Sequence, residues 1–248
     1  MANGPFETLK RSPAYRVVEE AVREKILDGV LAPGDLLPSE TDLADQLGVT
    51  RATVREAFRS LEGAGLVERG SRRRMMVTAP SPRIVRNAMH QAIVMHGVSY
   101  RELWELNMAL EPMAAALAAT NATSDILDAI RANLDRTAEC LSDPGALVEA
   151  DVEFHDLVAQ AAGNHALLIS REPLGELLFP AYGTVIRKVG PGRRLLEAHT
   201  KIYEALRDGD VDTARDWMAR HIRDFRRGCE VAGLDFDEPV TVSPNTDI

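Results

Sequence analysis

The sequence predicts a mostly α-helical protein, in which an N-terminal winged helix-turn-helix domain precedes an all-α antiparallel helical bundle. Three observations predict this fold class. Residues 39–67 contain two short helical patterns separated by a glycine, residues 66–78 contain two short apolar segments around an arginine-rich turn, and residues 83–231 show helical periodicity without a strand pattern. Aromatic residues make up only 5% of the chain, while alanine and leucine are abundant, which favours helix packing over sheets.

The residues from Ser39 to Val67 organise the first domain. Ser39 is a suitable N-cap for a short helix, Gly48 suits the left-handed position that ends it, and Thr50 can cap the next helix. Apolar residues then recur at i, i+3, i+4 and i+7, so one face of the second helix is expected to be buried. This face consists of Val54, Ala57, Phe58 and Leu61. Two short helices joined by a glycine-containing turn are typical of a helix-turn-helix, whose second helix enters the major groove of DNA.

The neighbouring segments favour a winged helix over a pair of ordinary helices with a solvated charged face. Upstream, residues 15–27 form an amphipathic helical pattern that ends at Gly29. Downstream, a strand is expected to begin at Leu66, and a second strand is expected over residues 75–78. The turn between them contains Arg72, Arg73 and Arg74, so the hairpin forms a basic wing that suits phosphates or the minor groove.

Residues 29–70 resemble the DNA-binding domain of the GntR family of bacterial transcription regulators, and the resemblance extends from about Tyr15 to Val77. The sequences PGD-LPSE, GVTRATVREA and LE-GL stand at the family's spacing. In that family the start of the recognition helix and the wing contact DNA. The resemblance therefore implies DNA contacts by Thr50, Arg51, Thr53, Arg55, Gly70, Arg72, Arg73 and Arg74. Two departures, Thr41 where many members have Arg and three arginines where many have a glycine-rich wing tip, imply a different operator sequence or balance of phosphate contacts.

The charge distribution is compatible with a double-stranded DNA operator as the partner, although the net charge of the chain is −9. Residues 1–80 hold 12 basic and 12 acidic residues, whereas residues 50–80 hold 7 arginines and 3 glutamates. The positive charge is therefore local to the predicted recognition helix and wing, and the acidic remainder is expected to be repelled by the duplex. One recognition helix reads few base pairs, so we expect a homodimer on a short inverted repeat.

The domain boundaries follow from composition and turn signals. We expect an N-terminal tail at residues 1–14, the winged helix-turn-helix at 15–78, a linker at 79–82, a helical effector-binding and dimerisation domain at 83–234, and a disordered tail at 235–248. The linker holds Pro80 and Pro82, so it is expected to be short and stiff. Seven helices are expected in the second domain, at about residues 83–95, 99–119, 123–141, 146–162, 166–188, 193–207 and 211–231.

Cellular location can be inferred from the apolar segments and the cysteines. The N-terminus has no apolar core of a signal peptide, and no apolar run approaches the roughly 20 residues needed to span a membrane. Cys140 and Cys229 are far apart in the sequence and are expected to be reduced thiols. The sequence thus predicts a cytoplasmic protein with no membrane partner.

Three histidines and one aspartate are predicted to point into the core of the second domain. Asp151 and His155 are four residues apart and share one helix face, while His199 and His221 lie in the apolar stripes of two other helices. Burying these groups is costly unless they are paired or bind a metal, and their spacing alone leaves both alternatives open. The other histidines, His90, His96 and His165, lie near helix ends and are expected to be surface or capping residues.

Residues 83–231 resemble the helical effector domain, called FCD, of the FadR-like branch of the same family. The D-x-x-x-H pair and the two later histidines match the metal-binding members of that branch. The resemblance implies that Asp151, His155, His199 and His221 hold one divalent ion, and imidazole and carboxylate ligands suit Zn, Ni, Mn or Fe. It further implies that a small carboxylate or sugar-acid effector binds at open metal positions facing a cavity.

Asn107 is the candidate residue for contacting the effector directly. It stands where many members of the branch have an arginine that helps to hold the effector carboxylate. An asparagine side chain donates and accepts hydrogen bonds but carries no charge. The effector is therefore expected to be less acidic, to be held mainly by the metal, or to have its second contact with another arginine; Asn107 could also simply line the cavity.

The sequence is compatible with two classes of function. The first is a ligand-responsive transcription repressor that an organic acid releases from its operator. The alternative is a metalloenzyme with an appended DNA-binding domain, which would need a general base beside the open metal position. Because no HExxH-like base accompanies the four ligands, we expect that the protein is not an enzyme and has no catalytic residues.

Overall fold

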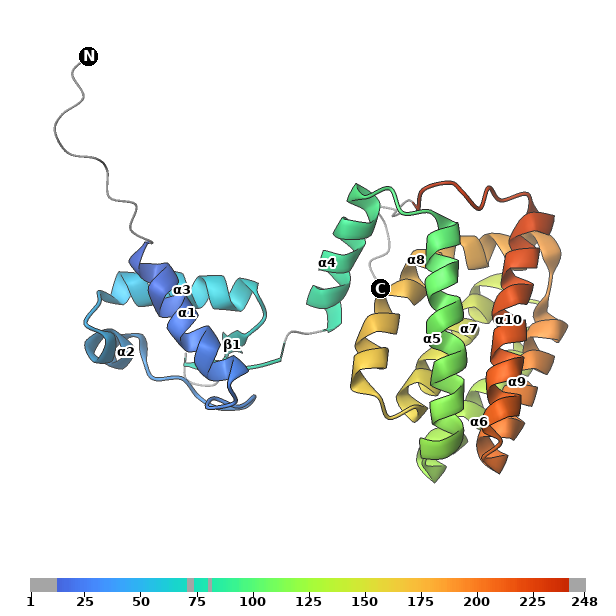
Figure 1. The fold of residues 1–248 in the computed structure, drawn as a ribbon, viewed down its shortest axis with the longest axis horizontal. Coiled ribbons are helices and arrows are strands. Elements are labelled where there is room, and N and C mark those ends of the chain that lie inside the picture. Colours follow the sequence, from blue (N-terminus) through green and yellow to red (C-terminus); the bar gives the residue numbers. More distant parts are fainter. Residues whose placement is uncertain (1–12, 71–73, 80–81, 241–248) are drawn as a thin grey trace, which may run out of the picture. The chain divides into compact units, whose positions relative to one another are not determined.

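The structure is a computed structural model that describes residues 13–70, 74–79 and 82–240. The chain divides into two compact units, residues 1–85 and 86–248. Figure 1 labels the helices and the strand β1, and the predicted fold class is confirmed. The first unit holds three helices and a two-stranded sheet among its described residues, whereas the described residues of the second unit contain no strand longer than an isolated bridge.

The first unit is the predicted winged helix-turn-helix. It begins with α1 (Ala14–Leu27), α2 (Glu40–Leu47) and α3 (Arg51–Gly63). The Ser39 hydroxyl accepts a bond from the backbone N–H of Asp42, and Gly48 ends α2 in the left-handed conformation with φ of 65°. The predicted apolar face of α3 is buried and packs against α1 and α2. Local caps and helical periodicity were sufficient to predict these elements because both act within a few residues.

The wing consists of β1 (Val67–Arg69) and β2 (Met75–Val77), which pair antiparallel. The register places Val67 opposite Val77, and both side chains are buried. The backbone N–H of Leu37 donates to the carbonyl of Met75 at 2.8 Å, and so joins the wing to the segment before α2. The wing is therefore fixed to the domain that carries the recognition helix.

The second unit contains an antiparallel arrangement of helices connected by short turns, as Figure 1 shows. α10 packs against α5, α8 and α9, while α7 packs against α5, α6 and α8. The core between them is rich in alanine, which allows the helix backbones to approach closely. The helices are α4 (Pro82–Met95), α5 (Tyr100–Asn121), α6 (Ser124–Glu139), α7 (Pro144–Ala161), α8 (His165–Val189), α9 (Gly192–Asp208) and α10 (Val211–Ala232).

The buried face of α5 differs from the one that apolar periodicity indicated. Leu103, Leu106, Leu110, Met113 and Leu117 recur at helical spacing and form the apolar side of the helix, but Leu106 is 38% exposed and Met113 is 52% exposed. The buried face instead contains Leu103, Asn107, Glu111 and several alanines. Hydrophobicity alone predicted the wrong rotation of this helix because its inward polar side chains have buried partners that only the tertiary structure supplies.

The segment after α10 corrects part of the predicted disordered tail. Residues 235–240 pack against the start of α5, and the backbone N–H of Val240 donates to the carbonyl of Val98 at 2.8 Å. Arg101 makes a bidentate ion pair with Asp237, and the Phe236 ring contacts Trp104 edge to face. The acidic composition of the segment predicted disorder, but its two apolar residues, Phe236 and Val240, are buried. The remainder of the predicted tail, residues 241–248, lies outside the described residues.

Candidate metal centre and nucleic-acid interface

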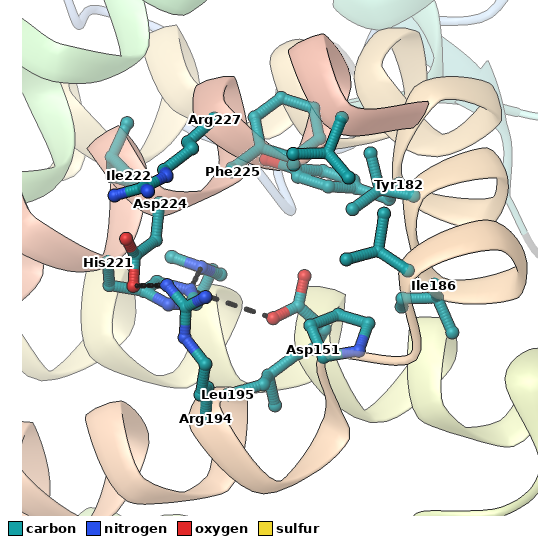
Figure 2. Close-up of a pocket in the computed structure, with 16 residues that line it drawn as sticks. Asp151, Tyr182, Ile186, Arg194, Leu195, His221, Ile222, Asp224, Phe225 and Arg227 are labelled. Atoms are coloured by element: carbon teal, nitrogen blue, oxygen red, sulfur yellow. Dashed lines mark hydrogen bonds and ion pairs between the residues drawn. The ribbon is translucent and has the colours of Figure 1, made fainter. Parts of the chain in front are cut away.

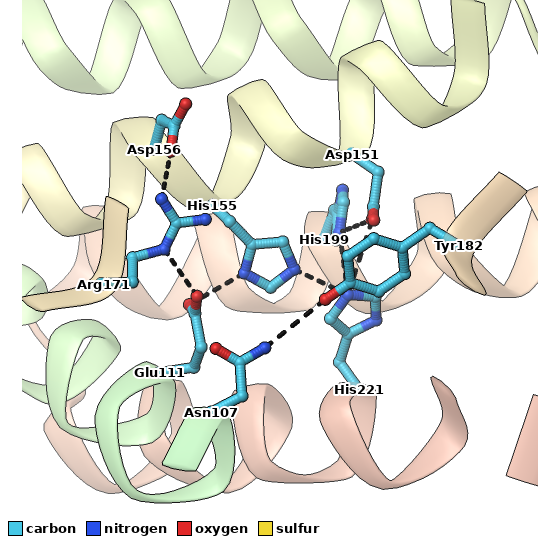
Figure 3. A network of polar contacts seen from close by, with 9 residues as sticks. All are labelled: Asn107, Glu111, Asp151, His155, Asp156, Arg171, Tyr182, His199 and His221. Carbon is cyan, nitrogen blue, oxygen red and sulfur yellow. Dashed lines mark hydrogen bonds and ion pairs between the residues drawn. The ribbon is translucent and has the colours of Figure 1, made fainter. Parts of the chain in front are cut away.

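The four predicted metal ligands converge on one buried point of the second unit. Asp151 and His155 lie on α7, His199 on α9 and His221 on α10, and one ligand atom from each lies within 4.8 Å of the other three. The Nε2 atom of His221 is 3.1 Å from Nε2 of His155 and 3.2 Å from Nε2 of His199. The Oδ1 atom of Asp151 is 3.3 Å from Nε2 of His199 and 3.7 Å from Nε2 of His221. Three imidazole nitrogens and one carboxylate oxygen thus surround a common centre (Figure 3).

These separations match the coordination shell of a small divalent cation. A metal–nitrogen bond of about 2.1 Å with ligand angles between a right angle and the tetrahedral value separates neighbouring ligand atoms by roughly 3.0–3.4 Å. Three of the separations given above, at 3.1–3.3 Å, fall in this range, whereas the 3.7 Å between Asp151 and His221 lies slightly outside it. Within the described part of the chain, the Oδ1 atom of Asp151 and the Nδ1 atom of His199 are buried with no hydrogen bond, although Nε2 of His199 lies 3.3 Å from that oxygen as an ion-pair contact. A carboxylate oxygen rarely stays buried in this way unless it has a partner such as an ion, so the residues fit a metal.

A second set of buried charges orients His155. The Oε2 atom of Glu111 is 2.8 Å from Nδ1 of His155, and Nε of Arg171 donates to the other oxygen of Glu111 at 2.7 Å. Arg171 also pairs with Asp156, so a chain of charged groups leads from the surface of α7 to the centre (Figure 3). A carboxylate on Nδ1 places the proton there and leaves the Nε2 lone pair facing the centre. Glu111 and Arg171 were not among the site residues predicted from the sequence, although a glutamate and an arginine inside largely apolar helical segments are a signal for such a buried pair.

The pKa values in this network agree with a site for a cation. Burial by itself would raise the pKa of Asp151, but the three nearby histidines lower it to about 2. Burial lowers the pKa of His221 to about 3, with a further contribution from charges on His199 and His155. Burial also opposes charge on His155, but Glu111 raises the pKa of that imidazole. The site therefore offers an ionised carboxylate, and His221 stays neutral with a lone pair at neutral pH.

Phe154 positions the third imidazole. Its ring stacks on the His199 ring with a centroid distance of 3.6 Å and an interplanar angle of 7°. Both rings are fully buried. Phe154 precedes His155 on α7, so the helix that supplies two ligands also restricts the orientation of a third on α9.

A cavity of about 100 Å³ opens beside Asp151, His155 and His221. Figure 2 shows Asp151 and His221 at one end of it, and side chains from α8, α9 and α10 complete its lining. Tyr182 lines the cavity, whereas Asn107 is not among its lining residues and donates a hydrogen bond of 3.4 Å to the Tyr182 hydroxyl. Asn107 thus lies behind Tyr182, and an effect of Asn107 on an effector would pass through that hydroxyl.

The predicted DNA-contacting residues of the recognition helix gather at its N-terminus. Thr50 caps α3 through a bond from the backbone N–H of Thr53, and the two threonine hydroxyls are 2.9 Å apart. Arg55 binds Glu40, the first residue of α2, at 3.0 Å, and Arg51 lies 4.0 Å from the same carboxylate. The bond from Arg55 lowers the pKa of Glu40. Glu40 was not among the residues predicted from the sequence, and it holds Arg55 close to the N-terminus of α3, the end that would face the groove.

The wing residues have different roles in the structure. Gly70 lies at the end of β1, where an added Cβ would be 3.3 Å from the carbonyl oxygen of Arg74 and from Cβ of Met76. The guanidinium of Arg74 donates to the carbonyl of Leu37 at 2.9 and 3.1 Å, so this arginine braces the base of the wing. Arg72 and Arg73, also predicted to contact DNA, lie outside the described residues.

A winged helix-turn-helix unit followed by a helical unit with a cavity is an arrangement typical of transcription regulators. Residues 14–77 match the family described as bacterial regulatory proteins, gntR family, and residues 102–224 match the FCD domain. The chain belongs to the GntR family and carries an FCD domain. All four predicted metal ligands lie within the FCD match.

The chain is similar along most of its length to proteins named HTH-type transcriptional repressor NanR. It is 28% identical to the protein from Cronobacter sakazakii over 224 residues, covering 86% of this chain and 84% of the relative. It is 26% identical to the Escherichia coli K12 protein over 219 residues, covering 86% and 83%. Among solved structures, Streptococcus agalactiae GntR superposes with a TM-score of 0.65 at 28% identity, covering 86% of this chain and 99% of that one.

The matched family consists of bacterial regulatory proteins and these relatives are named transcriptional repressors, so the metalloenzyme alternative is rejected. Over the residues that the structure describes, no helix is both long and apolar enough to cross a membrane.

Proposed function

We propose that this protein is a cytoplasmic, ligand-responsive repressor that binds a short inverted-repeat operator as a homodimer. A small organic acid, bound at a metal ion held by Asp151, His155, His199 and His221, releases it from the DNA. The observation that carries this proposal is the buried cluster of three histidines and one aspartate at the floor of a cavity, in a chain whose other unit is a winged helix-turn-helix.

The donor set, with three imidazoles and one carboxylate, suits a divalent first-row metal such as Zn, Ni, Mn or Fe. Such an ion accepts additional oxygen ligands and would attract a carboxylate to the cavity floor. Asp151 supplies one negative charge, and an imidazole bound to a metal is neutral, so the loaded centre would keep a net positive charge that favours an anionic effector. Glu111 and Arg171 hold His155, and Phe154 holds His199, so the ligands need little rearrangement when metal binds.

Metal content tests the centre. Protein purified without an affinity tag should contain about one divalent ion per chain, and His199→Ala should lose it because three ligands bind far more weakly than four. His165→Ala is the matched control, since His165 is exposed at the start of α8. A stoichiometric ion that survives both His199→Ala and His221→Ala would place the metal elsewhere and contradict the proposal.

DNA binding tests the regulatory role. Fluorescence anisotropy with DNA from the promoters flanking the gene should reveal a sequence that binds at least about a thousandfold more tightly than random DNA at physiological salt. Adding carboxylates to the metal-loaded complex should release the DNA, and His199→Ala should bind DNA without responding. Binding that shows no sequence preference, or equal release from wild type and His199→Ala, would overturn the regulatory proposal.

A further inference from the structure

The cavity has polar groups at its two ends and apolar walls between them. At the floor lie the predicted ligands Asp151, His155 and His221. The walls are built from aliphatic and aromatic carbon, and the Tyr182 hydroxyl is the only alcohol among the lining residues. The mouth contains three charged side chains, Arg194, Asp224 and Arg227. The wall residues include Val185, Ile186, Val189, Leu195, Ile222, Phe225 and Val231.

The connection of α9 to α10 explains why the two arginines share the mouth. These helices pack together and are joined by a two-residue turn, so they run antiparallel. Arg194 lies five residues before His199 on α9, and Arg227 lies six residues after His221 on α10. Both arginines therefore lie toward the same end of the helix pair, and the ion pair of 2.6 Å between Arg194 and Asp224 shows that the two helices meet there (Figure 2).

The mouth carries one positive charge that the described part of the chain does not neutralise. Asp224 offsets the charge of Arg194. Arg227 is exposed, lines the cavity, and has neither an ion pair nor a hydrogen bond with any of the described residues. A guanidinium with five free donors recognises a carboxylate with two parallel hydrogen bonds.

We infer that the effector is an aliphatic dicarboxylate of about four to six carbons, with one carboxylate at the metal and the other at Arg227. This inference rests on the proposed function and narrows its effector. A sugar acid would place several hydroxyls against the apolar walls, where only the Tyr182 hydroxyl could pair with them, and each unpaired hydroxyl opposes binding. A carbon chain with few polar atoms fits the same walls by burying its methylene groups.

The size of the site agrees with this class of ligand. A helix rises roughly 1.5 Å per residue, so the backbone of Arg227 lies about 9 Å along α10 from that of His221. An extended carbon chain advances roughly 1.2 Å per bond. A diacid of four to six carbons, bonded to the metal at one end and hydrogen-bonded to Arg227 at the other, therefore has a length comparable with this distance along α10.

The test compares glutarate with valerate, because both have five carbons and only glutarate has the second carboxylate. Isothermal titration calorimetry on the full chain loaded with Zn²⁺ should show glutarate binding at least about tenfold more tightly than valerate. Arg227→Gln should abolish this advantage without weakening valerate. Arg223→Gln is the matched control and should retain the advantage, since Arg223 is exposed on the same helix but does not line the cavity.

Several outcomes would overturn the inference. Gluconate binding more tightly than glutarate would show that the cavity satisfies hydroxyls, and an advantage of glutarate that persists in Arg227→Gln would remove that arginine from recognition. If glutarate and valerate bind equally well and His199→Ala abolishes both, the contact between Arg227 and a second carboxylate is rejected. The proposed metal-dependent site would then still stand. Absence of binding by any acid to metal-loaded protein would reject both the inference and the proposed effector site.

Discussion

At the scale of single residues, Glu111 connects the metal centre to the rest of the bundle. It is completely buried, and one of its oxygens contacts His155 while the other accepts from Arg171. Burial would raise the pKa of Glu111, but the charges of His155 and Arg171 lower it to about 2, so the side chain is ionised in the core. A buried carboxylate with two charged partners is worth little net stability, but removing it leaves Arg171 paired only with Asp156.

We predict that Glu111→Gln weakens metal binding by about ten- to a hundredfold, because the outer partner of a metal-bound histidine sets its tautomer and basicity. The protein should also lose about 1–3 kcal/mol of stability, since a buried charged hydrogen bond is lost. Competition with a chromophoric chelator measures the affinity, and urea unfolding of the metal-free protein measures the stability. Glu105→Gln, exposed on the same helix, is the control. Unchanged metal affinity would show that Glu111 is only a partner for Arg171.

The arginines at the start of α3 are not equivalent. Arg55 is held at 3.0 Å by Glu40, whereas Arg51 lies 4.0 Å from that carboxylate and its side chain is 61% exposed. Arg51 is therefore the freer of the two to reach a base edge, and Glu40 limits the positions open to Arg55.

We predict that Arg51→Ala costs about 1–3 kcal/mol on the operator and relaxes preference at one position per half-site, because a bidentate contact to a base is lost. Arg55→Ala should weaken operator and random DNA alike and reduce the dependence of binding on salt. Anisotropy titrations on operator variants at several salt concentrations measure both effects. Equal losses on specific and random DNA for Arg51→Ala would assign that residue to a phosphate.

At the scale of elements, α5 has an exposed apolar stripe beside its polar buried face. Leu106 and Met113 are exposed, while Leu110 and Leu117 are half-buried on the same side of the helix. Residues spaced alternately by four and three along a helix form a seam that suits packing against another helix. The proposed homodimer would supply such a helix from its second copy.

We predict that Met113→Glu shifts the protein from dimer towards monomer. The thermal stability of the monomeric chain should not fall, because the Met113 side chain is exposed within one chain. Light scattering after gel filtration over a range of micromolar concentrations measures the change. Glu105→Lys changes the charge of an exposed α5 residue outside the stripe and should leave the mass unaltered. A dimer that persists in Met113→Glu would place the interface on another surface.

At the scale of the whole molecule, the buried charges make stability depend on pH. The pKa of His221 is lowered to about 3 in the folded chain against an ordinary value near 6.5, so the unfolded chain binds more protons between these values and stability falls as the pH falls through this range. Glu111, with its pKa lowered to about 2, contributes stability above about pH 4.5 that is lost below it. The raised pKa of His155 acts in the opposite direction and offsets part of the loss.

We predict that metal-free protein melts at a lower temperature at pH 5 than at pH 7. Saturating Zn²⁺ should raise the melting temperature more at pH 7 than at pH 5, because protons compete with the ion for the imidazoles. His221→Asn should reduce the difference between the two pH values in the metal-free state, whereas His96→Asn, which changes an exposed histidine, should not. Scanning calorimetry with and without a chelator measures all four conditions. A metal-free protein that is more stable at pH 5 would show that His155 dominates.

The two units must communicate if the effector is to release DNA. The ligands and the cavity belong to α7, α8, α9 and α10, so an acid bound there contacts several helices at once. Any effect on the operator requires the acid to bind the DNA-competent and DNA-incompetent arrangements with different affinity, typically by about 1–3 kcal/mol. The proposed linker of residues 79–82, with its two prolines, would transmit such a shift instead of absorbing it.

We predict that a longer Gly-Ser linker in place of residues 79–82 preserves the affinity for acid and the affinity for operator but reduces the coupling between them. Titrating the acid against free and operator-bound protein measures the coupling, which must be the same in both directions. The control is Ser81→Ala, which keeps the native linker length and both Pro80 and Pro82. Undiminished coupling through the flexible linker would show that the signal travels through contacts between the units or across the dimer.

The sequence by itself determined the features that depend on nearby residues. Ser39 and Thr50 as caps, the buried face of α3, the wing strands and the order of the later helices all follow from periodicity and end signals within a few positions. The spacing of Asp151 and His155 likewise placed both on one face of α7. These predictions succeeded because hydrogen bonds within a helix or turn are local and each residue's contribution is nearly independent of the fold.

The tertiary structure alone decided which polar groups meet. It paired Glu111 of α5 with Arg171 of α8, turned the polar side of α5 inward, and placed residues 235–240 against the start of α5. It also brought Arg194 and Arg227 to one cavity mouth. Each of these contacts joins residues far apart in the chain, and the free energy of burying a charged side chain depends on the partner that the fold supplies, which no local pattern records.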